Sequence, residues 1–325
     1  MFSYSHAEGQ KKPFRYHHIL QHLEDDCGYS NAQLHLLSSN RSLSNRSDSN
    51  KKPSAYEQYS FTDKLGLDHH GKINYAQTKN IQMADIILLC LKSFQVASIL
   101  KEILATLKNN ASIVLAHNGM GTLNELPNNI EKKHNIYTLL TTHGCLRSAP
   151  LTITHTGVGS TDIGLLSGVT NLEQQQSLTQ LLNTALPKVQ YHENIKHKQW
   201  LKLAINCVIN PLTAINNVDN GQINHVEYLP TIIALLEEVV AVAKAESVIL
   251  DLGELKRIVE EVAQATAQNI SSMRCDVLAN RTSEIDYING YIHRLGIKNS
   301  IATPENTKMW QQVNNLGPRG DTPSH

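Results

Sequence analysis

The sequence has no excess of charge of either sign. Its 325 residues include 29 lysines and arginines and 29 aspartates and glutamates, which gives a formal net charge of zero. Nucleic acid and anionic membrane surfaces are therefore not expected as partners. No apolar run reaches the roughly 18 residues that cross a bilayer. Residues 1–14 do not contain the apolar core of a signal peptide, so we expect a cytoplasmic protein.

Cysteine and histidine motifs are absent as well. The five cysteines are scattered, and no Cys-x-x-Cys pair occurs. That arrangement indicates reduced thiols and argues against a disulfide framework or a zinc site. The adjacent histidine pairs at 17–18 and 69–70 do not show the i, i+4 spacing with a carboxylate that is typical of a metal-binding helix, so we expect no metal ion.

The N-terminal residues 1–60 are the least regular part of the chain. Residues 15–24 (RYHHILQHLE) fit a short amphipathic helix, and residues 33–37 (QLHLL) fit a strand. The segment 38–54 is rich in serine, asparagine and lysine. This composition favours an exposed loop or a disordered linker.

From residue 84 onward, apolar strands alternate with helical segments. We expect buried strands at 84–92, 111–119 and 135–144, with helices at 94–107 and 122–133 between them. Nearly continuous apolar runs such as ADIILLC are typical of parallel strands that are covered on both faces. The alternation predicts a doubly wound α/β sheet.

Polar residues follow each of these three strands. They are Lys92, His117-Asn118-Gly119 and Thr142-His143-Gly144. Ligands bind doubly wound sheets outside the carboxyl ends of the strands, so these groups predict a site there.

The segment 151–166 contains GVGSTD, which looks like half of a dinucleotide-binding fingerprint. A phosphate-binding loop needs a helix N-terminus directly after its glycines. The residues on both sides of this turn instead alternate between apolar and polar, as strands do. We therefore interpret 151–166 as a β-hairpin.

The pattern is helical from residue 194. The first helix, at 199–209, has an apolar face that consists of Leu201, Ala204, Ile205, Val208 and Ile209. Further helices are expected at 227–247, 253–271, 284–297 and 303–313, with a polar link at 271–283. Thr282 or Ser283 can cap the helix at 284, which would place Glu284 in its first turn.

Another face of the first helix carries Lys202, Asn206 and Asn210. Each step of four residues turns the helix by only about 40°, so the three side chains point into one narrow arc. Partial burial lowers the pKa of a lysine and makes it a plausible proton donor, and carboxamides can bind a carboxylate or a hydroxyl group. A solvated polar face is the alternative interpretation.

Several segments together resemble the ketopantoate reductase family, whose activity is that of a 2-dehydropantoate 2-reductase. They are LKSFQV (91–96), HNGMGTLNEL (117–126), TTHGCLRS (141–148), HTGVGSTDIG (155–164), WLKLAINCVINPLTAINNVDNG (200–221), NISSM (269–273) and SEIDYINGYI (283–292). The segments occur in the order of the family. The resemblance implies an α/β N-terminal Rossmann-type domain at 1–192, an all-α C-terminal domain at 193–316 and a flexible tail at 317–325.

The resemblance also implies an NADPH-dependent enzyme of pantothenate, and hence coenzyme A, biosynthesis that reduces 2-dehydropantoate to pantoate. Lys202 would donate the proton to the carbonyl oxygen, and Glu284 would contribute to catalysis and help to fix the substrate and the nicotinamide. The other implied substrate-binding residues are Asn118, Asn206, Asn210, Asn220 and Ser272. The implied cofactor-lining residues are Lys92, Asn118, Cys145 and Glu284. We expect a small-molecule substrate and a monomer or homodimer.

The N-terminal start departs from the family pattern. Relatives open with an apolar strand that runs into Gly-x-Gly-x-x-Gly, whereas Gly9 is the only glycine before Gly28 here. Arg41 stands where relatives often hold the 2′-phosphate of NADPH. Without small residues, a pyrophosphate cannot approach the backbone amides closely. We therefore predict weak NADPH binding or an altered reading frame at the N-terminus. The alternative functions are a non-catalytic relative and a reductase of another 2-oxo acid.

Overall fold

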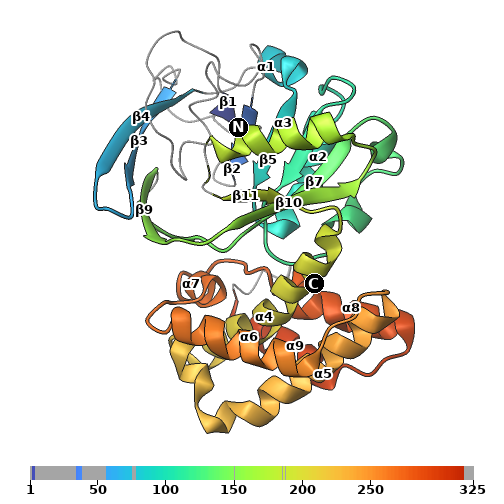
Figure 1. Cartoon of the computed structure of the whole chain (residues 1–325). Helices are drawn as coiled ribbons and strands as arrows, with labels where there is room; N and C mark the ends of the chain where they lie inside the picture. Colours follow the sequence, from blue (N-terminus) through green and yellow to red (C-terminus); the bar gives the residue numbers. More distant parts are fainter. Residues whose placement is uncertain are drawn as a thin grey trace, which may run out of the picture. The chain divides into compact units, whose positions relative to one another are not determined.

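The computed structural model describes residues 2–3, 34–38, 56–74, 78–149, 151–184, 186 and 188–317. By Cα proximity the chain divides into two units (Figure 1). Unit 1 consists of Met1–Leu91, Gln95–His117 and Leu126–Ile195, and unit 2 consists of Lys92–Phe94, Asn118–Glu125 and Lys196–His325. The helix predicted at 15–24, the loop predicted at 38–54 and the tail after Gly317 lie outside the described residues.

Among the described residues, a seven-stranded sheet forms the centre of unit 1. The strands, in spatial order, are β1 (Phe2–Ser3), β2 (Leu34–Ser38), β5 (Ile86–Cys90), β6 (Ser112–Leu115), β7 (Asn135–Thr141), β10 (Thr161–Ser167) and β11 (Val189–Tyr191). The neighbours β2, β5, β6 and β7 run parallel, whereas β10 is antiparallel to β7. The helix α2 (Ser93–Ile103) connects β5 to β6. These parallel strands confirm the predicted α/β class.

Side chains of the sheet and of the helix α3 (Leu172–Asn183) form a hydrophobic core in unit 1. The helix α3 directs Leu178, Leu181 and Leu182 into this core, which also contains Ile163 and Tyr137. The helix begins at Asn171, whose side chain accepts a hydrogen bond from the backbone N–H of Gln174. A short helix, α1 (Thr78–Met83), precedes β5.

The single helix predicted at 122–133 is wrong. The structure has two short 3-10 helices there, η2 (Thr122–Glu125) and η3 (Ile130–Lys132). Pro127 lies between them, and a proline disfavours the helical conformation of the residue before it and removes a backbone donor. Asn129 adds a left-handed backbone conformation, with φ of 65°. A continuous helix therefore cannot pass through this segment.

The hairpin predicted at 151–166 is also wrong, although both of its strands exist. The first, β9 (Thr152–Gly157), pairs with β8 (Gly144–Ala149) and β3 (Tyr56–Thr62) in a second sheet. The other strand is β10, which pairs with β7 and β11 in the main sheet. Alternation reveals a strand but not its partner, so the pattern alone could not separate a hairpin from a change of sheet. The fourth strand of the second sheet, β4 (Asp68–Asn74), pairs with β3, and neither was predicted because their sequence is mostly polar.

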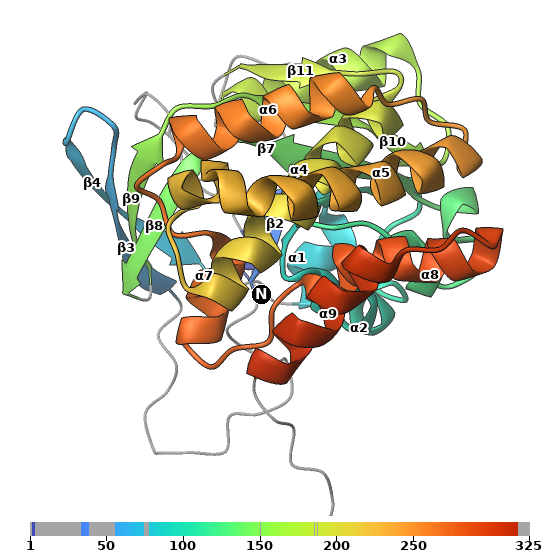
Figure 2. The ribbon, with the colours of Figure 1, turned by 90° about the horizontal axis from the view of Figure 1, so that it is seen from below.

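Unit 2 is helical apart from its connecting segments. Its helices are α4 (Ile195–Asn216), α5 (Leu229–Ala245), α6 (Leu252–Ala265), α7 (Ser272–Leu278), α8 (Asn289–Asn299) and α9 (Pro304–Leu316). The 3-10 helices η4 (Asn220–Asn224), η5 (Val226–Tyr228) and η6 (Ile285–Tyr287) lie between them. The helices α8 and α9 lie side by side (Figure 2). Residues of α4, among them Trp200, Leu203 and Val208, are fully buried in the core of this unit.

Two predictions for unit 2 need correction. The polar link expected at 271–283 contains the helix α7, which is capped by the side chain of Ser271. The helix expected at 284–297 is divided into η6 and α8 at Ile288, whose φ of −108° and ψ of −96° are not helical. Glu284 therefore precedes a 3-10 turn and does not lie in the first turn of a long helix.

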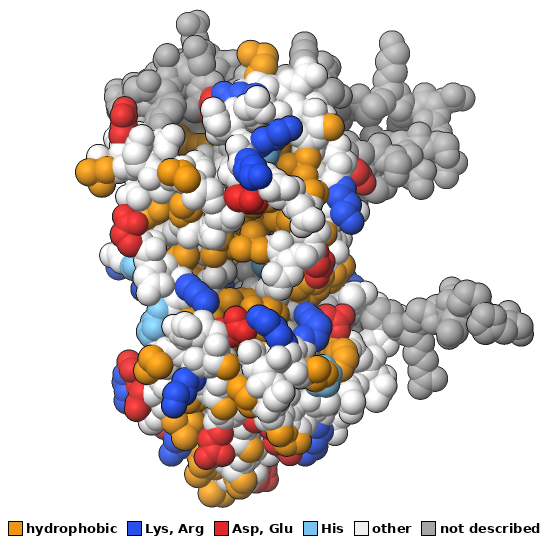
Figure 3. Space-filling view, turned by 90° about the vertical axis from the view of Figure 1, so that its right-hand side faces the viewer, with side chains coloured by type: hydrophobic (Ala, Val, Ile, Leu, Met, Phe, Trp, Pro, Cys, Tyr) orange, Lys and Arg blue, Asp and Glu red, His pale blue; other side chains and the backbone are white. Residues whose placement is uncertain are grey.

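Charges of both signs lie on the face of the molecule that Figure 3 shows. Lysines, arginines and acidic residues are interspersed over the face shown in Figure 3. Within the described ranges, no helix has both the length and the apolar character to span a membrane.

Candidate active site

The helix α4 carries the predicted polar stripe. Lys202 and Asn206 are half-buried, and Asn210 is buried with 7% exposure. The structure confirms one continuous helix through all three residues. The apolar face differs from the prediction, because Leu201 and Ile205 are only half-buried, whereas Leu203 and Cys207 are fully buried. The stripe therefore lies at the margin of the core, and the lowered pKa of Lys202 stays a prediction.

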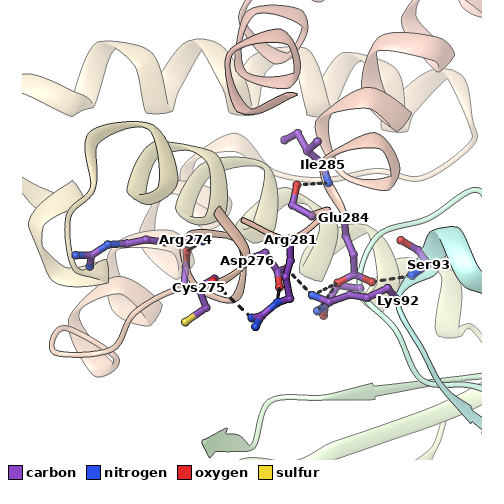
Figure 4. A network of polar contacts seen from close by, with 11 residues as sticks. Lys92, Ser93, Arg274, Cys275, Asp276, Arg281, Glu284 and Ile285 are labelled. Carbon is purple, nitrogen blue, oxygen red and sulfur yellow. Dashed lines mark hydrogen bonds and ion pairs between the residues drawn. The ribbon is translucent and has the colours of Figure 1, made fainter. Parts of the chain in front are cut away.

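The carboxylate of Glu284 lies at the centre of a second polar group in unit 2 (Figure 4). It is buried, with 5% exposure. Its Oε1 accepts a hydrogen bond from the backbone N–H of Ser93 at 3.0 Å, and its Oε2 accepts one from Asn118 Nδ2 at 3.3 Å. Lys92 Nζ is 3.8 Å from Oε2. Three of the predicted site residues, Lys92, Asn118 and Glu284, are thus brought together from distant parts of the sequence.

A second buried carboxylate, Asp276, belongs to this group and was not predicted. Its Oδ2 is 2.6 Å from Lys92 Nζ, and its Oδ1 is 3.2 Å from Arg281 Nε. Figure 4 shows Lys92 extended towards both carboxylates. Asp276 is 3% exposed, and two cations compensate its buried charge. Asp276 lies on α7, within the segment 271–283 that was expected to be a polar link, so it was not among the predicted site residues.

The backbone of Gly119 keeps the Asn118 segment close to Tyr287. Gly119 has φ of +80°, and the neighbouring Met120 N–H donates a hydrogen bond of 2.8 Å to the carbonyl oxygen of Tyr287. Tyr287 Oη donates to Glu125 Oε2 at 2.9 Å. Burial, together with this bond to a carboxylate, raises the pKa of Tyr287 far above its usual value. The phenol therefore stays protonated and keeps this contact at physiological pH.

Replacing Gly119 should disturb this segment. A Cβ atom at Gly119 would lie 2.4 Å from the carbonyl oxygen of Tyr287, and the positive φ adds strain. We expect Gly119→Ala to lower the free energy of unfolding by about 2–4 kcal/mol, measured by urea denaturation. Gly66→Ala is the matched control, because Gly66 has the same φ of +80°, but beyond its chain neighbours no atom of the described residues lies within 4 Å of the added Cβ. Equal losses in the two variants would contradict a role for the contact with Tyr287.

The remaining predicted residues have mixed surroundings. Asn220 is buried, and its Nδ2 donates to Thr266 Oγ1 at 3.0 Å, while its Oδ1 has no hydrogen-bond partner in the part of the chain that the structure describes. Ser272 is exposed at the start of α7. Cys145 is an exposed residue of β8 in unit 1. Gly9 and Arg41 lie outside the described residues.

The chain has a Rossmann-type sheet unit, which is followed by a helical unit. One helix of the second unit carries a lysine and two carboxamides. These features define a class of proteins that combine an α/β domain with an all-α domain. A family model described as Ketopantoate reductase PanE/ApbA matches residues 35–168, and its C-terminal counterpart matches residues 194–317. The chain belongs to the ketopantoate reductase family.

Relatives with this fold and sequence pattern are known. A 2-dehydropantoate 2-reductase from Shigella flexneri is 42% identical over 71% of this chain and 73% of its own length. One from Vibrio cholerae is 36% identical over 78% of this chain and 85% of its own length. Among solved structures, the ternary structure of D-mandelate dehydrogenase with NADH and anilino(oxo)acetate is similar in fold. It has a TM-score of 0.71 and 23% identity, and the match covers 79% of this chain and 84% of that one.

Proposed function

We propose that the protein is an oxidoreductase that reduces 2-dehydropantoate to pantoate with NADPH, a step of pantothenate biosynthesis. The observation that carries the proposal is the identity of 36% and 42% to two 2-dehydropantoate 2-reductases over most of the chain. The helix α4 supports it, because Lys202, Asn206 and Asn210 stand on one arc of that helix.

Lys202 acts as the general acid. NADPH, when bound, supplies the hydride that reduces C2 of the substrate. Negative charge develops on the oxygen at C2 as this carbon is reduced, and Lys202 Nζ stabilises that charge and donates the proton that completes the hydroxyl group. Asn206 and Asn210 donate hydrogen bonds to the carboxylate and hydroxyl groups of the substrate.

The group around Glu284 supports a nicotinamide cofactor. The buried carboxylate accepts a hydrogen bond from Asn118 Nδ2 and so orients that carboxamide. Lys92 and Asn118 both follow strands of the parallel sheet in the sequence, where this class of fold binds dinucleotides. Their ammonium and carboxamide groups have the chemistry to bind polar groups of such a cofactor.

A second candidate function follows from residues 1–14. This segment contains one glycine, Gly9, and does not supply the pattern of glycines that lets a pyrophosphate approach backbone amides. A chain that has lost cofactor binding would be a non-catalytic relative that still binds a small acid. Reduction of a different 2-oxo acid is a third possibility, since a lysine and asparagines suit many such substrates.

An NADPH-coupled assay separates these functions. We expect the purified protein to oxidise NADPH when 2-dehydropantoate is added, with a KM for NADPH raised by the atypical N-terminus. Fluorescence titration with NADPH measures cofactor binding without turnover. No binding at millimolar NADPH would favour the non-catalytic relative, and faster turnover of another compound in a panel of 2-oxo acids would favour the third function.

A further inference from the structure

Pro211 lies inside the helix α4. A proline has no backbone N–H, and its ring pushes against the carbonyl group four residues earlier. In α4 that carbonyl belongs to Cys207, which therefore cannot receive its usual helical hydrogen bond. Cys207 is fully buried, so water does not readily replace the missing donor. A buried carbonyl without a donor is costly.

Asn289 supplies the missing donor. This residue is fully buried at the start of α8, and its Nδ2 donates a hydrogen bond of 3.0 Å to the carbonyl oxygen of Cys207. The same Nδ2 is 3.0 Å from Asn306 Oδ1. Since an amide nitrogen carries two hydrogens, it can satisfy both acceptors. The Cys207 oxygen can only accept, which fixes the orientation of the Asn289 carboxamide.

Asn306 is itself held in place by Glu238. The backbone N–H and Nδ2 of Asn306 donate to Glu238 Oε2 at 2.9 and 2.8 Å. Glu238 Oε1 accepts from the backbone N–H of Glu305 at 2.8 Å, so this carboxylate also caps the start of α9. Asn289 therefore contacts α4 from a hydrogen-bonded group that joins α5, α8 and α9.

The Cys207 carbonyl that lacks its helical donor lies within the part of α4 that carries the polar stripe. Asn206 precedes Cys207 directly, and Asn210 precedes Pro211 directly. The angle between these two carboxamides depends on the course of α4 through the turn in which Pro211 removes a backbone donor. Among the residues that the structure describes, the buried Asn289 Oδ1 has no hydrogen-bond partner, which is a cost that an apolar side chain would avoid. The donor contact with Cys207 gives a physical reason for a carboxamide at this position.

We propose that Asn289 is a positioning residue for the active site. It completes the α4 hydrogen bonding that Pro211 interrupts, and it thereby holds Asn206 and Asn210 at the spacing that binds the substrate. The second part of this proposal rests on the proposed function, whereas the first part concerns only the helix.

A double-mutant cycle tests the proposal. Asn289→Ala removes the donor to Cys207, and Pro211→Ala restores a backbone N–H that can replace it. We expect Asn289→Ala to raise the KM for 2-dehydropantoate about tenfold, with kcat and the KM for NADPH changed less than about twofold. Amide hydrogen exchange in the 203–216 segment should be about tenfold faster. Both effects should be largely reversed in the double variant, although the lost bond to Asn306 is not restored.

Asn299→Ala is the matched control. Asn299 is also a carboxamide of α8, but it donates to Glu246 Oε1 and to the carbonyl oxygen of Leu295. The effects of Asn299→Ala on exchange and on the KM should add to those of Pro211→Ala, so Pro211→Ala should not reverse them. If Asn289→Ala does not fold alone, recovery of folded protein in the double variant is the supporting result.

Strictly additive effects of Asn289→Ala and Pro211→Ala on exchange in α4 would overturn the proposal. The positioning role would be overturned if the double variant restores exchange in α4 but Asn289→Ala alone leaves the KM for 2-dehydropantoate unchanged. If the unmodified protein does not turn over 2-dehydropantoate, the proposed function fails separately. The exchange cycle would still decide whether Asn289 completes α4.

Discussion

Lys202→Ala should lower kcat/KM for 2-dehydropantoate by about 10²–10⁴-fold, because it removes both the proton donor and the positive charge beside the reacting oxygen. The side chain is half-buried at the margin of the core, where charge is less screened than in water. Most of the loss should appear in kcat, since the charge on the oxygen develops only as C2 is reduced. Steady-state kinetics with NADPH held at saturation measures the change.

Two further variants separate proton donation from general effects. Lys202→Arg keeps a positive charge, but its guanidinium holds its proton far more tightly. We expect it to retain much of the substrate binding and to lose most of kcat. Lys196→Ala is the control on the same helix, because Lys196 is exposed and donates to the carbonyl oxygen of Glu246. A loss of less than tenfold for Lys202→Ala would contradict its role as general acid.

The stripe on α4 could be predicted because it depends on local geometry alone. Lys202, Asn206 and Asn210 share one arc of any helix that contains them, whatever packs around it. The same holds for β5 and β6, whose apolar runs identify buried strands without reference to their neighbours. Predictions of this kind are confirmed because the residues of one short segment determine the local structure.

The contacts of the second polar group could not be predicted from local pattern. Asn118 and Glu284 are 166 positions apart, and Lys92 and Asp276 are 184 apart. Only the resemblance to a family placed three of these four residues in one site, and it did not include Asp276. The hairpin predicted at 151–166 was wrong for the same physical reason, because strand pairing is a tertiary property that alternation does not encode.

Glu284→Ala should reduce both stability and activity. Ser93 N–H and Asn118 Nδ2 would each lose a charged acceptor, and the Ser93 amide would be left buried without a partner. We expect the free energy of unfolding to fall by about 1–3 kcal/mol. The loss is limited because Lys92 keeps its ion pair with Asp276. We also expect kcat/KM to fall about 100-fold or more, since Asn118 would no longer be oriented.

Glu284→Gln separates the effect of the negative charge of Glu284 from the effect of its size and shape. The three donors around Glu284 face two oxygens, whereas a glutamine presents one oxygen and one NH₂ group. If the NH₂ group points towards Ser93, two donors face each other there. If it points towards Lys92 and Asn118, it faces the ammonium group, and the Asn118 carboxamide must turn over to present its oxygen. We therefore expect Glu284→Gln to recover part of the stability and little of the activity.

Glu246 supplies the matched control for this experiment. Its Oε1 accepts from Lys298 Nζ at 3.1 Å and from Asn299 Nδ2 at 3.0 Å, and these hydrogen bonds lower its pKa. It therefore reproduces the lysine and asparagine donors of Glu284 away from the proposed site. Glu246→Ala should cost some stability and leave kcat/KM within about twofold of the unmodified protein. A comparable loss of kcat/KM in both variants would show that the fall reflects the fold, and Glu284 would then lose its role at the reacting centre.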